Sequence, residues 1–262
     1  MAAIVGLYLA YLLAGMVAQV QAARGIRVGF DFLFLPSGFQ IPESLFAVGS
    51  SDTYLTVILA GLGNTVMVAA IAIPLATVLG TILGLARLFA PSPVAKAVAA
   101  YIEIFRNTPV LVQIFWFYFA FPILAPFDIS PLMAAALGIS LNSAAFSAEI
   151  YRGGIQSIDP GQWEAARAIG MRYFQIMRRI IMPQALRRML PALTNRGIEI
   201  FKMTTLASAI AYGELLHQAR LIASINYNPI EAYTVVALAF FVILYPIVRA
   251  TYALERRMAK GD

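Results

Sequence analysis

Long apolar runs, separated by short polar stretches, dominate the pattern of this 262-residue chain. A helix that crosses a bilayer needs about 20 mostly apolar residues, and runs of that length recur along the sequence. The pattern therefore predicts an all-α integral membrane protein with about six transmembrane helices. These helices are expected at residues 3–22, 53–86, 97–122, 131–151, 189–210 and 230–253.

Two of the six runs depart from a simple span. The run at 53–86 is longer than a bilayer requires and contains Pro74, which indicates a kinked helix with an interfacial lead-in. The run at 189–210 contains three charged residues, so hydropathy supports it least.

The chain is expected to fold as two parts. Residues 1–52 are predicted to form an N-terminal transmembrane helix and a partly helical interfacial segment. The helix is read as retained, because no basic segment precedes it as in a signal peptide. Residues 53–262 are predicted to form the main transmembrane domain, with one large polar loop at 152–188.

Composition and charge indicate how the spans are oriented. The chain is 61% hydrophobic and only 12% charged, with a mean hydropathy of +0.79, more apolar than a soluble fold of this size could bury. The loops at 87–96, 152–188 and 254–262 together carry twelve Lys and Arg, whereas the opposite loops carry three. Since positive charge gathers in cytoplasmic loops, both termini and the 152–188 loop are predicted to be cytoplasmic. Residues 23–52 are then periplasmic.

Several classes of site are disfavoured by what the sequence lacks. The chain has no cysteine and a single histidine, His217, which argues against thiol catalysis and a multi-histidine metal centre. No nucleophile–base pair stands out, so catalytic residues are not expected and a membrane-embedded enzyme is disfavoured. The net charge of +6 is read as topology rather than as nucleic-acid binding. His217 falls in an outer loop and is expected to be a polar surface group.

The polar loop reads "SIDPGQWEAARAIGMRYFQIMRRIIMPQAL" at residues 157–186 and predicts two short helices. Asp159 is a good N-cap, Pro160 suits the first helical position, and Gln162 can complete a capping box. Gly170 is a natural residue just past the helix end. A second helix follows, with an apolar stripe that includes Tyr173, and is expected to stop at Pro183.

Small residues of this loop are expected to face outward. Trp163, Ala165, Ala166 and Ala168 would form a surface that another protein can approach closely. From local physics alone, an amphipathic loop lying in the membrane interface is an equally good interpretation.

The stretch "EAARAIGMRYFQIMRRIIMP" resembles the EAA signature of permease subunits of ATP-binding-cassette (ABC) importers. The triplet at 164–166, Gly170, Ile180 and Pro183 fit its spacing, and Met182 replaces a leucine. The resemblance implies the transmembrane domain of a type I ABC importer, whose coupling helix docks on an ATPase subunit. The implied ATPase-coupling residues are Asp159, Gly161, Glu164, Ala165, Ala166 and Gly170.

A wider resemblance, over roughly residues 53–257, narrows the family. "YIEIFRNTPVLVQIFWFYF", "SAEIYRGGIQSIDPGQWEAARAIG" and "MPQALRRMLPALTNRGIEIFKMTTLASAI" are similar to segments of polar-amino-acid permeases of the histidine, glutamate and glutamine type. These permeases often have an acidic or amide residue where this chain has Met203. The resemblance therefore implies an amino acid substrate, with polar or acidic amino acids favoured over basic ones.

Charged and polar residues inside the predicted spans need a partner or a wet cavity. One interpretation is a substrate pathway, in which Arg106 or Lys202 meets a carboxylate and a glutamate meets the ammonium group. The other is that Glu103 pairs with Arg106, and that the stripe at 196–202 fixes helix register or reaches the membrane surface. The pathway candidates are Glu103, Arg106, Gln113, Glu199, Lys202 and Thr204.

The expected partners follow from the resemblance and from one missing motif. The chain has no Gly-x-x-x-x-Gly-Lys-Ser/Thr loop, so ATP and Mg²⁺ are expected on a separate ATPase dimer and no cofactor in this chain. A second permease subunit, a periplasmic binding protein and a bacterial inner membrane are also implied. The alternative is an ion-coupled secondary amino acid transporter, but the internal repeat typical of that class is not visible.

Overall fold

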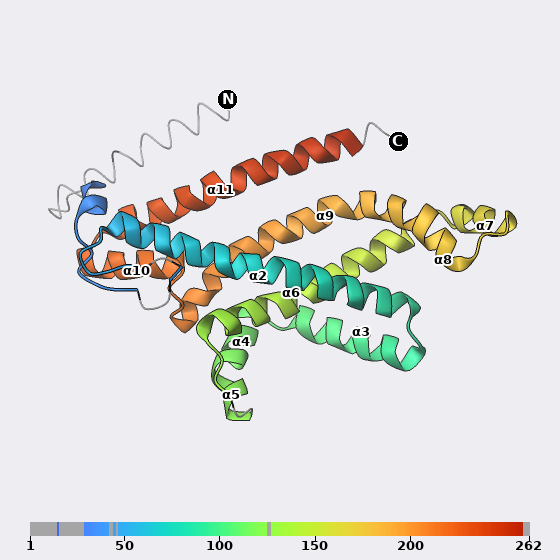
Figure 1. Ribbon diagram of the computed structural model, residues 1–262, viewed down its shortest axis with the longest axis horizontal. Coiled ribbons are helices and arrows are strands. Elements are labelled where there is room, and N and C mark those ends of the chain that lie inside the picture. The colour runs from blue at the N-terminus through green and yellow to red at the C-terminus, as the bar shows by residue number, and fades with distance from the viewer. Residues whose placement is uncertain (1–14, 16–28, 42–43, 46, 125–126, 259–262) are drawn as a thin grey trace.

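The computed structural model describes residues 15, 29–41, 44–45, 47–124 and 127–258. The predicted first span, 3–22, lies outside these residues except for Gly15. The described chain is helical almost throughout, in a bundle of long helices (Figure 1). Its elements are η1 (Asp31–Phe34), α2 (Tyr54–Phe89), α3 (Ser92–Asn107), α4 (Val110–Phe115), η2 (Trp116–Ala120), α5 (Phe121–Leu124), α6 (Pro131–Gln156), α7 (Pro160–Ala168), α8 (Tyr173–Ile176), η3 (Met177–Ile181), α9 (Met182–Met203), η4 (Thr204–Ile210), α10 (Leu215–Asn226) and α11 (Pro229–Met258).

Three of these helices, α2, α6 and α11, are long and apolar enough to cross a membrane, or four spans exist if the bent pair α3–α4/α5 counts as one. The predicted spans at 53–86, 131–151 and 230–253 are thus confirmed, and each helix ends a few residues later than predicted. Helix α2 continues through Pro74 for 36 residues in all. At about 1.5 Å per residue it is longer than a bilayer core.

The prediction of one continuous helix at 97–122 is wrong. Helices α3 and α4 meet at an angle of 104°. The break falls at Thr108, which has extended backbone (φ −107°, ψ 131°) and precedes Pro109. A proline disfavours helical backbone in the residue before it and offers no N–H to the helix. The uninterrupted apolar run hides this local signal.

The prediction that Pro183 ends a helix is also wrong. The chain is helical from α8 through the π-helix η3 into α9, and Pro183 lies in the first turn of α9. The Met182 N–H bonds to the Met177 carbonyl, five residues back. The same wide turn, from Phe121 to Trp116, precedes Pro122. A π-turn shifts the hydrogen-bond ladder just where proline lacks its donor.

The end of the bundle opposite α7 and α8 is built from the segment before α2 together with α10 (Figure 1). We call it the outer end, because the basic loops predict that it faces the periplasm. The segment contains η1 and two isolated bridges, Pro36–Thr53 and Ile41–Val48, so it is partly helical as predicted. Helix α10 was not predicted, because its residues fell in a loop between spans. His217 belongs to this helix and is half-buried, so the expectation of a plain surface group is wrong.

The closest packing in the bundle is between α2 and α6. A Cβ atom at Gly84 would lie 2.8 Å from the Ala148 carbonyl oxygen and 2.8 Å from Tyr151 Cβ. The two backbones therefore approach as small residues allow in membrane helices. This contact holds α6 in place, and the polar loop follows directly from its last turn.

Candidate functional site

Helix α7 has a fixed beginning and a fixed end. The Asp159 carboxylate accepts a hydrogen bond from the Gly161 N–H at 2.7 Å, as expected of an N-cap. Gln162 does not complete the predicted capping box. Its side-chain oxygen instead accepts a hydrogen bond from the Gln184 amide nitrogen at 3.4 Å. At the other end Gly170 has φ +79°, a left-handed conformation that suits glycine.

The turn after α7 is a Schellman motif. The Gly170 N–H bonds to the Arg167 carbonyl at 2.9 Å, and the Met171 N–H bonds to the Ala166 carbonyl at 3.1 Å. These two bonds satisfy carbonyls that the helix end would otherwise leave open. The turn also fixes the direction in which α8 leaves. Helix α7 is thus held at a defined angle to the rest of the chain.

A small core lies beneath α7. Ala166 is only 2% exposed and packs in a cluster with Ile176, Ile181 and Met189, which come from α8, η3 and α9. The expectation that Ala166 faces outward is therefore wrong, because it is a contact with the chain's own core. Trp163 is partly buried against the same cluster.

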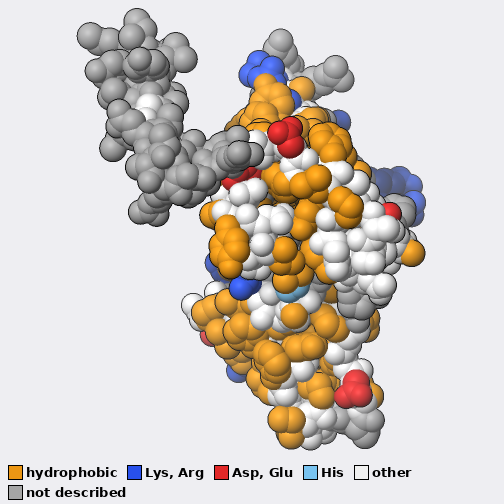
Figure 2. Space-filling view, turned by 90° about the vertical axis from the view of Figure 1, so that its left-hand side faces the viewer, with side chains coloured by type: hydrophobic (Ala, Val, Ile, Leu, Met, Phe, Trp, Pro, Cys, Tyr) orange, Lys and Arg blue, Asp and Glu red, His pale blue; other side chains and the backbone are white. Residues whose placement is uncertain are grey.

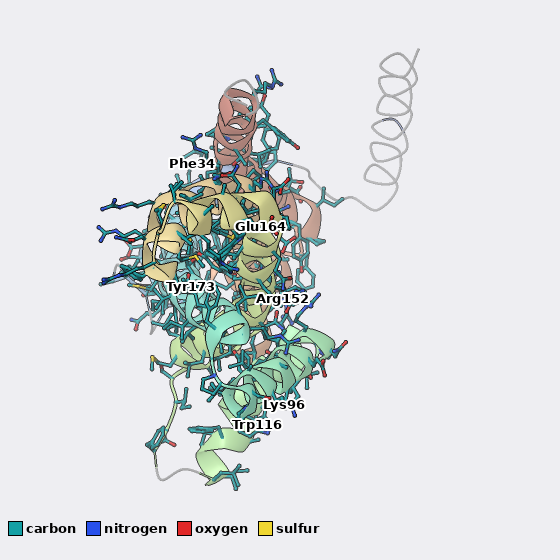
Figure 3. The ribbon with its side chains drawn as sticks, turned by 90° about the vertical axis from the view of Figure 1, so that its right-hand side faces the viewer. Phe34, Lys96, Trp116, Arg152, Glu164 and Tyr173 are labelled. Carbon is teal, nitrogen blue, oxygen red and sulfur yellow. The ribbon has the colours of Figure 1, made fainter. Side chains whose placement is uncertain are left out.

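The opposite face of this segment is exposed. Figure 3 looks onto this end of the molecule, where Glu164 and Tyr173 lie. Glu164, Ala165 and Arg167 are exposed, and Ile169 and Phe174 are 76% and 70% exposed. Two large apolar side chains in this position are costly in water and typical of a docking surface. We call the exposed set the coupling surface, after the role that the sequence resemblance implies: Glu164, Ala165, Arg167, Ile169, Tyr173 and Phe174.

The coupling surface is joined to the bundle through aromatic rings. The Tyr173 ring lies 5.8 Å from that of Trp163 and 6.0 Å from that of Phe89, at the end of α2. A hollow of about 440 Å³ runs beside these rings and is lined in part by Glu164 and Arg167. A movement of α7 would therefore be transmitted to α2 as well as to α9.

A second polar feature is a groove between α3, α6 and α9. It has a volume of about 480 Å³ and is lined by Arg106, Phe146, Glu149, Ile150, Ala192, Asn195, Arg196 and Glu199. Two of the pathway candidates, Arg106 and Glu199, thus meet in one place.

Arg196 is the centre of the groove. It is 7% exposed, pairs with Glu199 at 2.7 Å and donates to the Ser143 hydroxyl at 3.0 Å. Its guanidinium carbon lies 4.4 Å from the centre of the Phe146 ring, and that of Arg106 lies 5.1 Å from the same ring. The groove thus holds two cations against one aromatic ring, and two carboxylates, those of Glu149 and Glu199, lie in the same lining.

The other candidates lie elsewhere. Glu103 and Lys202 are exposed, and neither lines the groove. The predicted Glu103–Arg106 pair is wrong, because the ion pairs among the described residues are Glu149–Arg152 and Arg196–Glu199. Thr204 is fully buried and donates to the Phe201 carbonyl.

Gln113 has a structural position at the break between α3 and α4. Its amide nitrogen donates to the Phe105 carbonyl at 3.0 Å and to the Thr108 carbonyl at 3.1 Å. Gln113 therefore satisfies carbonyls that the bend frees. Gln113 and Arg106 do not lie on one continuous helix, because the helix is interrupted between them.

The aromatic and hydroxyl partners of the two arginines were missed by sequence reasoning. Ser143, Phe146 and Glu149 recur at intervals of three along α6 and share one face. That spacing could have indicated from the sequence that these three side chains share one helix face. Among the residues that the structure describes, no group of three or more His, Asp or Glu could hold a metal ion.

Comparisons with known proteins agree with this geometry. Residues 76–260 match the model of the family described as binding-protein-dependent transport system inner membrane component. The chain is 37% identical to the probable amino-acid ABC transporter permease protein YckA of Bacillus subtilis, over 71% of this chain and 82% of that protein. It is 34% identical to the glutamine transport system permease protein GlnP of Escherichia coli, over 78% of this chain and 94% of that protein.

A solved structure has the same fold. It is described as an amino acid ABC transporter with histidines, is 34% identical, and superposes with a TM-score of 0.73 over 78% of this chain and 95% of its own.

Proposed function

The chain belongs to the family of binding-protein-dependent transport system inner membrane components, and from this membership we propose that it forms half of the membrane pathway of an ATP-driven amino acid importer. It is a permease subunit, and its family disfavours the ion-coupled alternative. We propose that a separate ATPase dimer binds ATP and Mg²⁺. A second permease copy, identical or homologous, would complete the pathway, and a periplasmic binding protein would deliver the substrate.

The observation that carries the proposal is the coupling surface. It is a capped helix on a packed base, with a carboxylate and two large apolar side chains exposed beside it. Such a surface offers an ATPase subunit both an apolar contact and a charge to pair with. Glu164 would make the polar contact, Ala165 would allow close approach, and Asp159, Gly161 and Gly170 would hold the helix in place.

The mechanism follows from differential binding. An ATPase dimer that closes on ATP brings two coupling surfaces together and favours one arrangement of the spans, while hydrolysis releases that preference. In this chain α9 is the direct link, because it is continuous with the coupling segment through η3. The proposal places the coupling surface in the cytoplasm of a bacterium and the outer end in the periplasm, as the basic loops predict.

The substrate is proposed to be an amino acid. Relatives carry names that specify arginine or glutamine, so the family alone does not select one. Met203 supplies no charge for a basic side chain and is partly buried among apolar residues, which supports polar or acidic amino acids over basic ones. Arg106 is proposed to meet the carboxylate and Glu199 the ammonium group at the groove, with Lys202 nearby on the same helix.

The proposal is tested by Glu164→Lys in the assembled complex, measured as ATP-dependent uptake of amino acids into vesicles. Reversal of an exposed interface charge is expected to lower uptake and ATPase binding by at least about tenfold. Asp128→Lys, the same charge reversal on an exposed residue far from the coupling surface, is the matched control. Normal uptake by Glu164→Lys, with the protein inserted, would contradict the proposal.

A further inference from the structure

The break between α3 and α4 deprives one backbone carbonyl of its usual partner. In a regular helix the Phe105 carbonyl would accept from the N–H of residue 109, and residue 109 is a proline, which has none. Two side chains take its place. Gln113 donates to this carbonyl at 3.0 Å, and Asn142 of α6 donates to it at 2.8 Å. The break is therefore held by α6 as well as by α4.

Arg196 of α9 contacts the side chains of α6 that lie beside this break. Its guanidinium donates to the Ser143 hydroxyl at 3.0 Å and to the Asn142 side-chain oxygen at 3.5 Å. The guanidinium carbon lies 4.4 Å from the centre of the Phe146 ring. An arginine that is only 7% exposed and is held by a hydroxyl, an amide and a ring is fixed relative to α6.

Two of these residues of α6 extend the connection to α3. Asn142 is the residue that donates to the Phe105 carbonyl, and the Phe146 ring is also in contact with Arg106, whose guanidinium carbon lies 5.1 Å from its centre. Phe105 and Arg106 belong to the last turn of α3 before the break. Helix α9 is therefore joined, through α6, to the residues that set the direction of α4.

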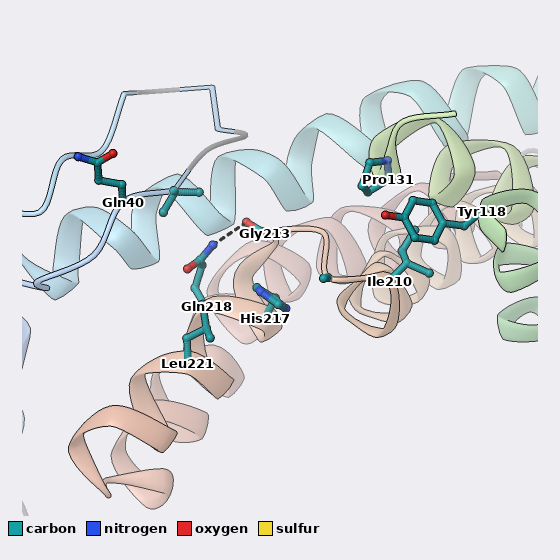
Figure 4. A pocket seen from close by; sticks show the side chains of 10 residues that line it. Gln40, Tyr118, Pro131, Ile210, Gly213, His217, Gln218 and Leu221 are labelled. Atoms are coloured by element: carbon teal, nitrogen blue, oxygen red, sulfur yellow. Dashed lines mark hydrogen bonds between the residues drawn. The ribbon is translucent and has the colours of Figure 1, made fainter. Parts of the chain in front are cut away.

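The segment beyond the break projects from the bundle. We call residues 110–124, which comprise α4, η2 and α5, the arm, and it leaves α3 at an angle of 104° (Figure 1). Tyr118 of the arm lines a cavity of about 260 Å³ at the outer end, together with Ile210 and His217 (Figure 4). Figure 2 looks onto this end, where hydrophobic side chains cover much of the described surface. A change in the angle of the arm would therefore move one wall of this cavity.

We propose that Arg196 is a positioning residue that transmits movement of α9 to the arm and so connects the outer cavity to the coupling end. The inference rests on the proposed function and deepens it, since α9 is continuous with the coupling segment. When the ATPase displaces the coupling surface, α9 carries Arg196 with it. The contacts with Asn142 and Phe146 then shift the last turn of α3, and the arm turns about Thr108.

The contacts separate this role from that of an ion pair. Glu199, which pairs with Arg196 at 2.7 Å, lies on the same helix and its side chain is 56% exposed. A pair within α9 cannot join α9 to α6, and its exposure limits its strength. The flat guanidinium is required instead, because a lysine has neither a second donor arm for Ser143 nor a face that stacks on Phe146. Removal of Arg196 also leaves no buried carboxylate unpaired.

The test measures the arm in the permease–ATPase complex in lipid vesicles, with one labelled permease copy per complex. Spin labels on Lys96→Cys, near the start of α3, and on Ile123→Cys, near the end of the arm, report the angle between the two, and both positions are exposed. The distance between the labels is expected to differ between the nucleotide-free and the ATP-bound complex. Arg196→Gln is expected to abolish this difference and to raise the ATP hydrolysed per amino acid imported by about tenfold.

Two further variants decide what the loss means. Arg196→Lys keeps the charge and is expected to lose the distance change as Arg196→Gln does, with ATPase binding unchanged in both. Arg187→Gln is the matched control, the same substitution at an exposed arginine of α9 outside the groove, and is expected to respond as the wild type does.

The inference would be overturned by a wild type whose arm does not respond to ATP, by a normal response in either Arg196 variant, or by the same loss in Arg187→Gln. In each of these cases, ATP-dependent uptake by the wild-type complex would leave the proposed function standing. Absence of that uptake would contradict the proposed function itself.

Discussion

The two ends of this permease differ in how they are assembled and in which side chains they expose. The coupling end is a short contiguous segment with exposed charge and exposed apolar side chains on a packed base. The outer end is assembled from segments as far apart as Gln40 and Leu221, which line a cavity of about 260 Å³ next to a hollow lined by Arg220. The first is proposed to present a fixed surface to an ATPase subunit, whereas the second encloses a small volume.

One continuous stretch of helix connects the two ends. Helix α9 begins in the coupling segment and passes into η4, which ends at Ala211 in a left-handed conformation (φ 58°) just before α10. A non-glycine residue in that conformation is strained by about 1 to 2 kcal/mol. The regular helix of this connection, α9, is at the coupling end, and its strained residue, Ala211, is beside the cavity.

The largest expected effect that separates the two ends is the pH dependence of α10. Burial raises the pKa of the Glu214 carboxyl to about 7, against two backbone hydrogen bonds that lower it. The folded state thus favours the protonated acid. Its contribution to stability is full below the ordinary value of 4.5 and is lost as pH rises to about 7.

The loss is about 3 kcal/mol, at about 1.4 kcal/mol per pKa unit. Hydrogen exchange of the α10 amides, corrected for the intrinsic exchange rate, should show less protection at pH 7 than at pH 4.5. Glu214→Gln should remove this dependence, and the same slope in that variant would exclude Glu214 as its cause.

The next largest effect is expected at the coupling end, where α7 depends on the turn at Gly170. Gly170→Val places a β-branched residue at φ +79° and is expected to cost about 2 kcal/mol of local stability. ATPase affinity of the complex should fall about tenfold, because α7 loses its fixed end. Gly153→Ala is the control, since a Cβ at Gly153 meets no atom within 4 Å and alanine favours helices. Equal affinities for the two variants would show that the turn does not position α7.

Local signals explain why α7 was predictable from sequence. Asp159, Pro160 and Gly170 act within a few residues of one another, so the cap, the first turn and the end of the helix could be placed without knowing the fold. The wide turns before Pro122 and Pro183 were not predictable in the same way. A proline normally predicts a helix end, and only the surrounding packing decides that the chain continues through a π-turn instead.

Contacts between segments far apart in the sequence could not be predicted for a related reason. The arginine pair on Phe146 requires α3, α6 and α9 to meet, and the apolar run at 97–122 concealed the break that lets α3 turn toward them. Helix α10 was read as a loop because its twelve residues are too short to span a membrane. The face of Ala166 was mistaken because α8 and η3 fold back over it.

The most direct test of the account is the accessibility of single cysteines at the two ends. The natural sequence contains no cysteine, so Ala165→Cys on the coupling surface and Tyr227→Cys at the outer end can each be labelled with a maleimide without background. In the assembled complex, the ATPase should slow labelling at position 165 by at least about tenfold, as a protein interface excludes water and reagent. Labelling at position 227 should not change. Equal labelling at position 165 with and without the ATPase, in a complex that still hydrolyses ATP and imports amino acids, would contradict the account.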